Sequence, residues 1–387
     1  MKICYLADGR YIHAHRWLKF FTERGHQMSL LSFAGMQPHH IEAVENSGAR
    51  YLGELEPFHL KRFWRTTRQL KRLRKIFRRE KIDIVHSHFL GVNAWYGALS
   101  RFHPTVITVM GGDILGENWK PGDDIRERWL TPFALHNADL ITCWSSKLTK
   151  VVERYTRPGI PIEVIHGGVD TEWFRPGPKP QALREELSIP ADAKVILSPR
   201  LMRPLYNLDK IALAAAHVWA QVPNAYFVFA VLPEAKDLEY ERQVREILSR
   251  DTAGRVRFLD AIPHERMADY YRLADVTISI PSSDGTPMSV LESMACGTPV
   301  VCGDISDYDT QHFERGKTVQ MVNVREPLSV AEALTTLMQD GRLATRMADE
   351  ARRRVIEYGS YEAQMGRMEQ LYRTLAMSRR SQAVFCI

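Results

Sequence analysis

Two carboxylates flank a short apolar segment in the second half of the chain, SSDGTPMSVLESMACGTPVV at 282–301. Asp284 precedes a Gly-Thr-Pro turn, and Glu292 follows it after seven intervening residues. We expect a helix here, with Thr286 as its N-cap and Pro287 as its first residue. At 1.5 Å per residue, Glu292 then lies about 9 Å along the helix axis from the cap. The free N–H groups at such an N-terminus attract an anion, most simply a phosphate.

This arrangement suits a ligand that carries hydroxyl groups on both sides of its phosphates, as a nucleotide sugar does. Carboxylates accept hydrogen bonds from vicinal hydroxyls, while guanidinium and helix N–H groups bind a diphosphate. The segment SPRLMRPLYN supplies two cations, Arg200 and Arg203, and an arginine fork also stabilises the charge that a leaving diphosphate gains. A capping aspartate and a buried, ion-paired glutamate show the same spacing, so the spacing alone leaves both interpretations open.

The elements that must position these residues alternate between apolar strands and amphipathic helices. Such alternation predicts βαβ units and a parallel sheet covered on both faces, with ligands at the carboxyl ends of the strands. A Gly- and Pro-rich segment at 166–181 separates two such series and indicates a crossover between domains. The predicted strands are 2–7, 28–33, 83–88, 105–110 and 139–144 in the first series, and 193–199, 225–232, 255–260, 275–281 and 299–303 in the second.

Length and composition agree with two soluble α/β domains. A chain of 387 residues exceeds what one hydrophobic core usually serves, and 45% hydrophobic with 25% charged residues is ordinary for globular proteins. The longest apolar run, 226–232, is too short to span a bilayer, and the N-terminus is typical of a buried strand, so we expect a cytoplasmic protein. The five cysteines show no metal-ligand spacing and are predicted to be reduced, structural thiols.

A dense run of lysine and arginine occupies 59–81 in a chain whose net charge is +6. Phe63, Leu70, Leu73 and Phe77 recur there at helical spacing and predict one apolar stripe surrounded by cations. A solvated surface helix fits this pattern, and so does contact with an anionic membrane surface or an acidic acceptor. The membrane hypothesis predicts salt-sensitive binding to anionic vesicles, lost on neutralising the basic residues Arg72, Arg74, Lys75, Arg78 and Arg79.

Missing motifs argue against several enzyme classes. No GxGxxG follows a predicted strand, and neither GxxxxGK[ST] nor GxSxG occurs. A dinucleotide oxidoreductase, a P-loop NTPase and an α/β-hydrolase therefore lose their expected signatures. His86 and His88, in the motif HSH, lie on one face of a predicted strand, but no third ligand is in view, and a structural role is favoured over a metal site.

Several ordered motifs together resemble the retaining glycosyltransferases of family four. The family signature is Glu, seven residues, Glu, and here it is Asp284, seven residues, Glu292. DGRYIHAHRWLKFFTERGH resembles the family's first loop and helix, and IHGGVDTEWFRP its interdomain segment. VRFLDAIPHERMADYYRLADVTISIPSS resembles its approach to the donor site, and YEAQMGRMEQLYRTLA its terminal helix.

The resemblance covers nearly the whole chain and implies the GT-B fold, an α/β architecture of two Rossmann-like domains with parallel sheets facing across a cleft. It implies an acceptor-side N-terminal domain at 1–170 and a nucleotide-sugar donor-binding domain at 171–359. The C-terminal helix at 360–377 is expected to pack back on the first domain.

Residue by residue, the resemblance implies a donor site in the second domain. Glu292 would bind the ribose hydroxyls, Asp284 the hydroxyls of the transferred sugar and Arg200 the diphosphate. The family's lysine, five residues after this arginine, is Leu205 here, which leaves Arg203 as its substitute by inference. Backbone amides between the two acids would cradle the sugar and diphosphate, from Gly285, Thr286, Pro287 and Met288 to Ser289.

On the acceptor and phosphate side the chain departs from the family. Many relatives carry a histidine in HGxD close to the transferring sugar, whereas this chain has MGGD, with Met110 in that place. Asp113 remains and is expected to orient the acceptor or sugar, with a helix N-cap as the alternative. The first-loop and glycine residues expected near the ligand are Gly9, His13, Arg16, Gly111 and Gly112.

We therefore expect a metal-independent enzyme, without a cofactor, that moves a sugar from a nucleoside diphosphate sugar to a hydroxyl of a glycan, lipid-linked or small-molecule acceptor. Asp113, Arg200 and Asp284 are its predicted catalytic residues. The family's retaining chemistry needs no side-chain nucleophile and depends on positioning and on stabilising the leaving diphosphate. The alternatives are a GT-B nucleotide-sugar epimerase or hydrolase and a non-catalytic sugar-nucleotide-binding protein. No nucleic acid is expected as a partner, and the expected location is the cytoplasm or the inner face of its membrane.

Overall fold

The computed structural model of the chain divides into two compact units, each of which is described by itself. The first unit comprises Met1–Gly167 and Gln364–Ile387, and the second comprises Gly168–Ala363. The chain therefore passes from one unit to the other after Gly167 and again after Ala363. The structure describes residues 1–33, 35–56, 58, 63–111, 113–114, 125–230, 237–249, 251, 253–260, 262–306 and 308–384.

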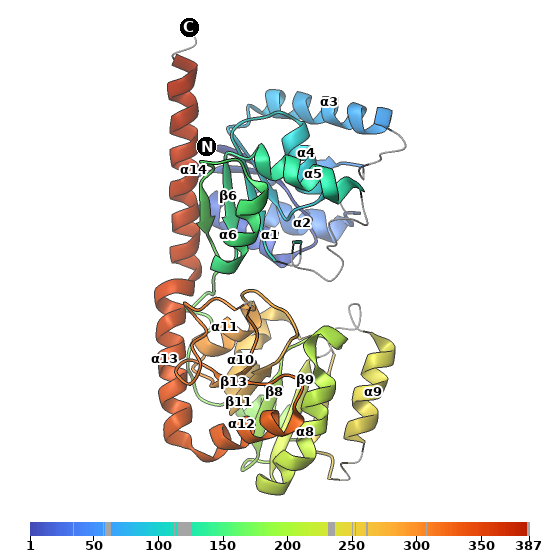
Figure 1. Cartoon of the computed structure of the whole chain (residues 1–387), viewed down its shortest axis with the longest axis vertical. Helices are drawn as coiled ribbons and strands as arrows, with labels where there is room; N and C mark the ends of the chain where they lie inside the picture. The colour runs from blue at the N-terminus through green and yellow to red at the C-terminus, as the bar shows by residue number, and fades with distance from the viewer. Residues whose placement is uncertain are drawn as a thin grey trace. The chain divides into compact units, whose positions relative to one another are not determined.

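The first unit is a parallel sheet of seven strands in the order β3-β2-β1-β4-β5-β6-β7. Its residues up to Gly167 are coloured blue to green in Figure 1. The order reverses between β1 and β4, which marks the switch point where open α/β sheets bind ligands. Its strands are β1 Lys2–Leu6, β2 Gln27–Ser32, β3 Arg50–Glu54, β4 Ile84–His88, β5 Thr105–Val109, β6 Leu140–Cys143 and β7 Ile162–Val164. Its helices are α1 Ile12–Glu23, α2 Pro38–Asn46, α3 Phe63–Glu80, α4 Val92–Leu99, α5 Ile125–His136 and α6 Ser146–Val152, joined by most of α14, Tyr361–Val384.

The second unit is a parallel sheet of six strands in the order β10-β9-β8-β11-β12-β13, with its switch point between β8 and β11. Its strands are β8 Lys194–Ser198, β9 Ala225–Ala230, β10 Val256–Leu259, β11 Val276–Ser279, β12 Val300–Gly303 and β13 Gln320–Val322. Its helices are α7 Gln181–Glu186, α8 Leu208–Gln221, α9 Leu238–Leu248, α10 Met267–Leu273, α11 Met288–Ala295, α12 Pro327–Gln339 and α13 Gly341–Gly359.

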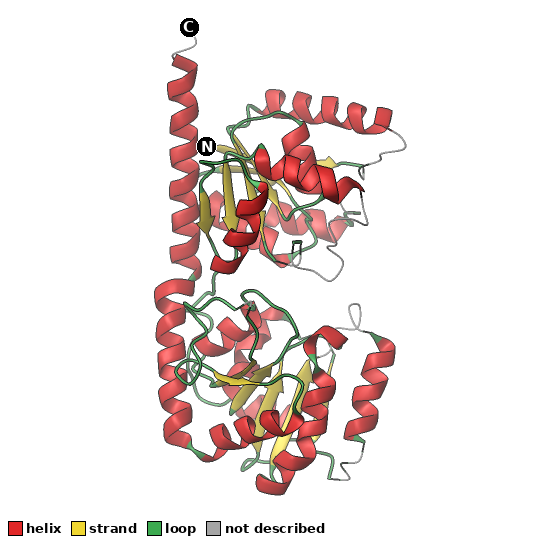
Figure 2. Cartoon of the chain, in the orientation of Figure 1, coloured by secondary structure: helices red, strands yellow, loops and turns green. Residues whose placement is uncertain are grey.

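Helices cover both faces of the second sheet (Figure 2). Successive residues of its strand β8 pack in two different buried clusters. Ile196 of β8 packs in one buried cluster with residues of α8, α9 and α12. Its neighbours Val195 and Leu197 pack in the other, with residues of α10, α11 and α13. Since side chains alternate along a strand, a sheet buried on both faces needs apolar residues at every position. This explains why β8 is almost continuously apolar.

The apolar stripe of the basic segment faces inward. Leu70, Leu73, Ile76 and Phe77 of α3 are all buried in the first unit, whereas the side chain of Phe63 lies outside the described residues. The stripe predicted from the sequence therefore belongs to the core, and most of the cations of α3 are exposed to solvent. Among the described residues, no helix is both long and apolar enough to cross a bilayer.

The helix α14 is fastened to the first sheet by a buried polar chain. The Tyr372 hydroxyl bonds the Tyr5 hydroxyl at 2.9 Å and also bonds Nδ1 of His86. Nε2 of His86 bonds Oγ1 of Thr108 at 2.6 Å. Burial and the neighbouring His88 hold the pKa of His86 well below its ordinary value. Both ring nitrogens of His86 are thus engaged by hydroxyl groups, which supports the structural interpretation of the HSH motif.

Candidate active site

Three of the predicted donor-site residues meet at the switch point of the second sheet. Arg200 follows β8 and Asp284 follows β11, and these strands are neighbours in the sheet. Nη2 of Arg200 donates to Oδ2 of Asp284 at 2.6 Å, and Nη1 donates to Oγ of Ser289 at 3.2 Å. The guanidinium also stacks over the ring of Tyr206, 4.2 Å from its centroid. Residues assigned to different groups of one ligand therefore bond one another.

The Arg200 side chain is 12% exposed and that of Asp284 is 19% exposed, so the pair is only partly screened by water. Burial alone lowers the pKa of Arg200, but the Asp284 carboxylate and the Tyr206 ring raise that pKa above its ordinary value. Arg200 therefore stays charged, and its guanidinium is engaged by the Asp284 carboxylate.

The side-chain amide of Asn207 links the two loops that carry Arg200 and Asp284. Asn207 adopts a left-handed conformation, with φ of 52°, and its Nδ2 donates to the carbonyl of Ile280 at 2.8 Å. The backbone N–H of Ser282 in turn donates to the carbonyl of Leu205 at 2.8 Å. Arg203 lies in the same loop as an exposed residue just before the short 3-10 turn Pro204–Tyr206. The position of Leu205, where the family has lysine, thus contributes a backbone bond.

The helix α11, which contains Glu292, begins one residue later than expected. Pro287, with ψ of 110°, is the N-cap of α11, so the prediction that Thr286 caps the helix is wrong. The carbonyl of Pro287 accepts the first helical bonds, while Thr286 is buried before the helix. Proline has no N–H, so Met288 and Ser289 provide the free first-turn amides. Gly297, with φ of +75°, ends the helix as predicted.

Glu292 lies deep in the second turn of α11, and its side chain is 7% exposed. Oε2 accepts a hydrogen bond from the Tyr271 hydroxyl at 3.1 Å, and Oε1 lies 3.0 Å from Nε2 of His264. Burial, together with Glu292, raises the pKa of Tyr271 well above its ordinary value, so this hydroxyl stays a donor. Neither Tyr271 nor His264 was predicted as a partner of Glu292. Because a buried carboxylate needs hydrogen-bond donors, a glutamate on the buried side of a predicted helix indicates that such partners exist.

The first unit contains a cavity of about 660 Å³ at the carboxyl ends of β1, β4, β5 and β6. This volume falls in the range of small-molecule sites. Tyr11 and Phe89 are exposed aromatic residues of its wall, and Met110 lines it as well. The polar groups of the lining come from Asp8, Arg10, His88 and Asn93.

Asp113 organises the loops behind this cavity. Its carboxylate accepts hydrogen bonds from the backbone amides of Gly111 at 2.7 Å, Leu90 at 2.9 Å and Met110 at 3.2 Å. Burial nevertheless raises the pKa of Asp113. Asp113 and Ile114 form a turn, and the segment 115–124 that follows lies outside the described residues, so the N-cap alternative stays a prediction. Its predicted role in orienting the acceptor or sugar remains a prediction, and the structure adds a bracing role for the loops after β4 and β5.

Replacing Asp113 by asparagine is expected to reduce the free energy of unfolding by about 1–3 kcal/mol. An amide offers one acceptor oxygen to three N–H groups and turns a donor toward the others. Chemical denaturation measures this loss, and Asp192→Asn at an exposed site provides the matched control. Equal stability of the two variants would show that the three bonds contribute nothing.

Three other predicted residues of the first unit are described by the structure: Gly9, Arg16 and Gly111. Gly9 packs so closely that an added Cβ would lie 2.6 Å from Cε of Met36, and its carbonyl lies 2.7 Å from Nε2 of His15. Gly111 has φ of +119°. Arg16 is half-buried in α1. Gly112 and the side chain of His13 lie outside the described residues.

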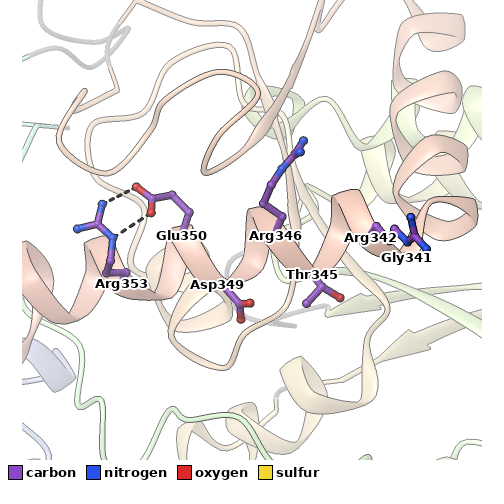
Figure 3. Close-up of a pocket in the computed structure, with 7 residues that line it drawn as sticks. All are labelled: Gly341, Arg342, Thr345, Arg346, Asp349, Glu350 and Arg353. Carbon is purple, nitrogen blue, oxygen red and sulfur yellow. Dashed lines mark hydrogen bonds and ion pairs between the residues drawn. The ribbon is translucent and has the colours of Figure 1, made fainter.

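A second hollow, on the outer face of α13, does not combine such features (Figure 3). Every residue that lines it comes from this one helix, and its Arg353 and Glu350 are paired with each other at 2.6 Å. Salt bridges of this exposed kind contribute little, and none of Arg200, Asp284 and Glu292 lines the hollow. We therefore assign it no part in the chemistry.

Comparison with known proteins agrees with this organisation. Residues 9–173 match the model of "Glycosyltransferase Family 4" and residues 180–354 that of "Glycosyl transferases group 1". The D-inositol 3-phosphate glycosyltransferase of Thermobispora bispora is 27% identical over 310 residues, covering 76% of this chain and 70% of the relative. That of Kineococcus radiotolerans is 27% identical over 300 residues, covering 72% and 68%.

Solved structures show the same fold. A glycosyltransferase from Rickettsia africae has a TM-score of 0.81 at 14% identity, covering 97% of this chain and 98% of that one. Anabaena Alr3699/HepE, solved in complex with UDP and glucose, has a TM-score of 0.79 at 17% identity, covering 97% and 100%. The two parallel-sheet units and the family models, which together match nearly the whole chain, show that the protein belongs to the family 4 glycosyltransferases and has the GT-B fold.

Proposed function

We propose that the protein transfers a sugar from a nucleoside diphosphate sugar to a hydroxyl of a small phosphorylated polyol, with retention of the anomeric configuration. The observation that carries this proposal is the cluster of Arg200, Asp284 and Ser289 at the β8–β11 switch point, beside the free amides of α11. These groups match the charges and hydroxyls of a sugar diphosphate.

In the proposed reaction, the bond between the anomeric carbon and the diphosphate oxygen breaks, and the acceptor oxygen bonds that carbon on the same face. The acceptor's proton passes to the departing diphosphate. Arg200 and the first-turn amides of α11 meet the negative charge that develops on the diphosphate. Asp284 exchanges its bond with Arg200 for bonds to sugar hydroxyls, so donor binding opens an ion pair that already exists in the chain.

The acceptor class is proposed from the relatives and from the cavity of the first unit. The relatives are named for D-inositol 3-phosphate. In this chain Arg10 supplies a cation for a phosphate at the cavity. The Arg10 side chain is 47% exposed and is paired with the Asp8 carboxylate at 2.7 Å. Tyr11 and Phe89 offer aromatic faces to a polyol ring. A phosphate that binds Arg10 replaces a largely exposed ion pair, which costs little.

The test is an assay of UDP-glucose, UDP-N-acetylglucosamine and GDP-mannose with and without D-inositol 3-phosphate. We expect release of nucleoside diphosphate to require the acceptor with one of these donors, and NMR to show an α-linked product from the α-linked donor. Release at the same rate without acceptor would identify a hydrolase. Isomerised donor would identify an epimerase, and binding without turnover a non-catalytic protein.

We also propose that α3 contacts an anionic membrane surface through charge. Its exposed residues Arg68, Lys71, Lys75 and Arg78 recur every three or four positions and so share one face of the helix. No ion pair links these four to an acid among the described residues. Trp64, 61% exposed, lies at the start of the helix. Because the apolar stripe is buried, the proposed contact is electrostatic and the helix does not insert into the membrane. The Trp64 indole adds an apolar contact at the start of the helix.

A further inference from the structure

The buried carboxylate of Glu292 is held at both oxygens by side chains outside its own helix. Tyr271 comes from α10, and His264 comes from the 3-10 turn His264–Arg266 that leads into it. The carboxylate has no arginine or lysine partner in the described part of the chain. His264 is 35% exposed and is therefore the open side of this cluster, whereas Tyr271 is fully buried.

Holding both oxygens fixes the plane of the carboxylate. The terminal torsion of glutamate is broad and roughly two-fold, so a single hydrogen bond leaves the group free to swing. Two donors on different oxygens remove that freedom and still leave about half of the roughly four lone-pair positions of a carboxylate unused. Two free acceptor positions match the two hydroxyl donors of a vicinal diol.

His264 and Tyr271, the two anchors of the Glu292 carboxylate, are themselves fixed by packing. The carbonyl of Tyr271 accepts a hydrogen bond from Oγ1 of Thr298 at 2.7 Å, which ties α10 to the end of α11. The ring of Phe174 is buried 5.4 Å from the ring of His264 and 6.0 Å from that of Tyr271. Phe174 comes from the Gly- and Pro-rich segment. This segment therefore does more than connect the units, since its Phe174 packs against both His264 and Tyr271.

We propose that His264 and Tyr271 are positioning residues that aim Glu292 at the ribose of the donor, and that His264 sets the preference for ribose over 2′-deoxyribose. The inference rests on the proposed function and on the assignment of the donor ribose to Glu292, which the resemblance to the family implies. A hydrogen bond to a charged group changes affinity by about 10- to 100-fold. We therefore expect wild-type protein to bind UDP that much more tightly than 2′-deoxy-UDP, or GDP than 2′-deoxy-GDP if the enzyme uses guanosine.

Isothermal titration calorimetry of two His264 variants tests the inference. His264→Leu removes the donor and is expected to erase most of the ribose preference by weakening UDP and not 2′-deoxy-UDP. His264→Gln keeps an N–H donor and is expected to restore much of the preference. A structural role of His264 would weaken both nucleotides equally, and such a result would overturn the inference, as would an unchanged preference in His264→Leu.

Glu292→Gln separates failure of the inference from failure of the proposed function. If this variant loses the ribose preference while His264→Leu keeps it, Glu292 contacts the ribose and His264 does not position it. If Glu292→Gln keeps the full preference, or if wild-type protein binds none of these nucleotides, the donor site itself is misplaced and the inference falls with it.

Discussion

Replacing Arg200 by lysine is expected to lower kcat by about 10²-fold, in the range found when one transition-state donor is removed from an enzyme. The guanidinium bonds Asp284 and Ser289 with two different nitrogens and stacks on Tyr206. Lysine keeps the charge, so the partly buried Asp284 carboxylate stays paired and the fold is preserved. It loses the planar fork that holds two oxygens of a diphosphate at once.

The measurement is steady-state kinetics at saturating donor and acceptor, with Arg203→Lys as the matched control. Arg203 is exposed, and a point charge is what the family's lysine would supply there, so this exchange is expected to change kcat little. A comparable loss at Arg203 would move the catalytic cation to that residue. A higher KM for Arg200→Lys at unchanged kcat would mean that Arg200 binds the donor equally in the ground and transition states.

The interior strands of both sheets were predictable, and three edge strands were not. The predicted strands correspond to β1, β2, β4, β5 and β6 in one sheet and to β8–β12 in the other. The unpredicted strands are β3, β7 and β13, which lie at sheet edges and are only partly buried, whereas the fourth edge strand, β10, was predicted. An interior strand of a parallel sheet is buried on both faces and is recognisably apolar, whereas an edge strand has fewer neighbours and a weaker signal.

Proximity within the candidate site depends on topology more than on local pattern. Arg200 and Asp284 were each expected at the carboxyl end of a strand, but only the pairing of β8 with β11 brings them within bonding distance. His264 and Tyr271 bond Glu292 because α10 packs on α11, which no spacing within the sequence reveals. Phe174 was assigned to a crossover, and its burial in the second unit's core follows from tertiary packing alone.

The basic helix shows how one pattern fits two structures until packing is known. The 59–81 run predicted an apolar stripe among cations, and burial of Leu73 and Phe77 assigns that stripe to the core. Packing also corrects the set of cations that is available for binding. Arg74 turns inward to the carbonyls of Ser100 and Leu99, and Arg72 bonds the carbonyl of Glu54.

Neutralising the four exposed cations of α3 is expected to weaken binding to anionic vesicles by about 10³-fold at low salt. Each lysine or arginine at an anionic surface contributes about 1 kcal/mol, so Arg68, Lys71, Lys75 and Arg78 together contribute about 4 kcal/mol. Vesicle sedimentation with phosphatidylcholine and phosphatidylglycerol mixtures measures the change after all four are replaced by glutamine. Wild-type binding is expected to fall steeply with added salt, because the Debye length shrinks from about 30 Å at 0.01 M to about 8 Å at 0.15 M.

The matched control removes the same number of charges from other exposed positions, Lys150, Arg325, Arg342 and Arg346. We expect this control to bind nearly as wild type does, because these cations are not gathered on α3. An equal loss in both variants would mean that net charge alone drives binding, and absence of wild-type binding at low salt would refute membrane contact.

Trp64→Ala is expected to weaken binding in both salt conditions by a similar factor, because transfer of an indole to the interface depends on apolar contact and is insensitive to screening.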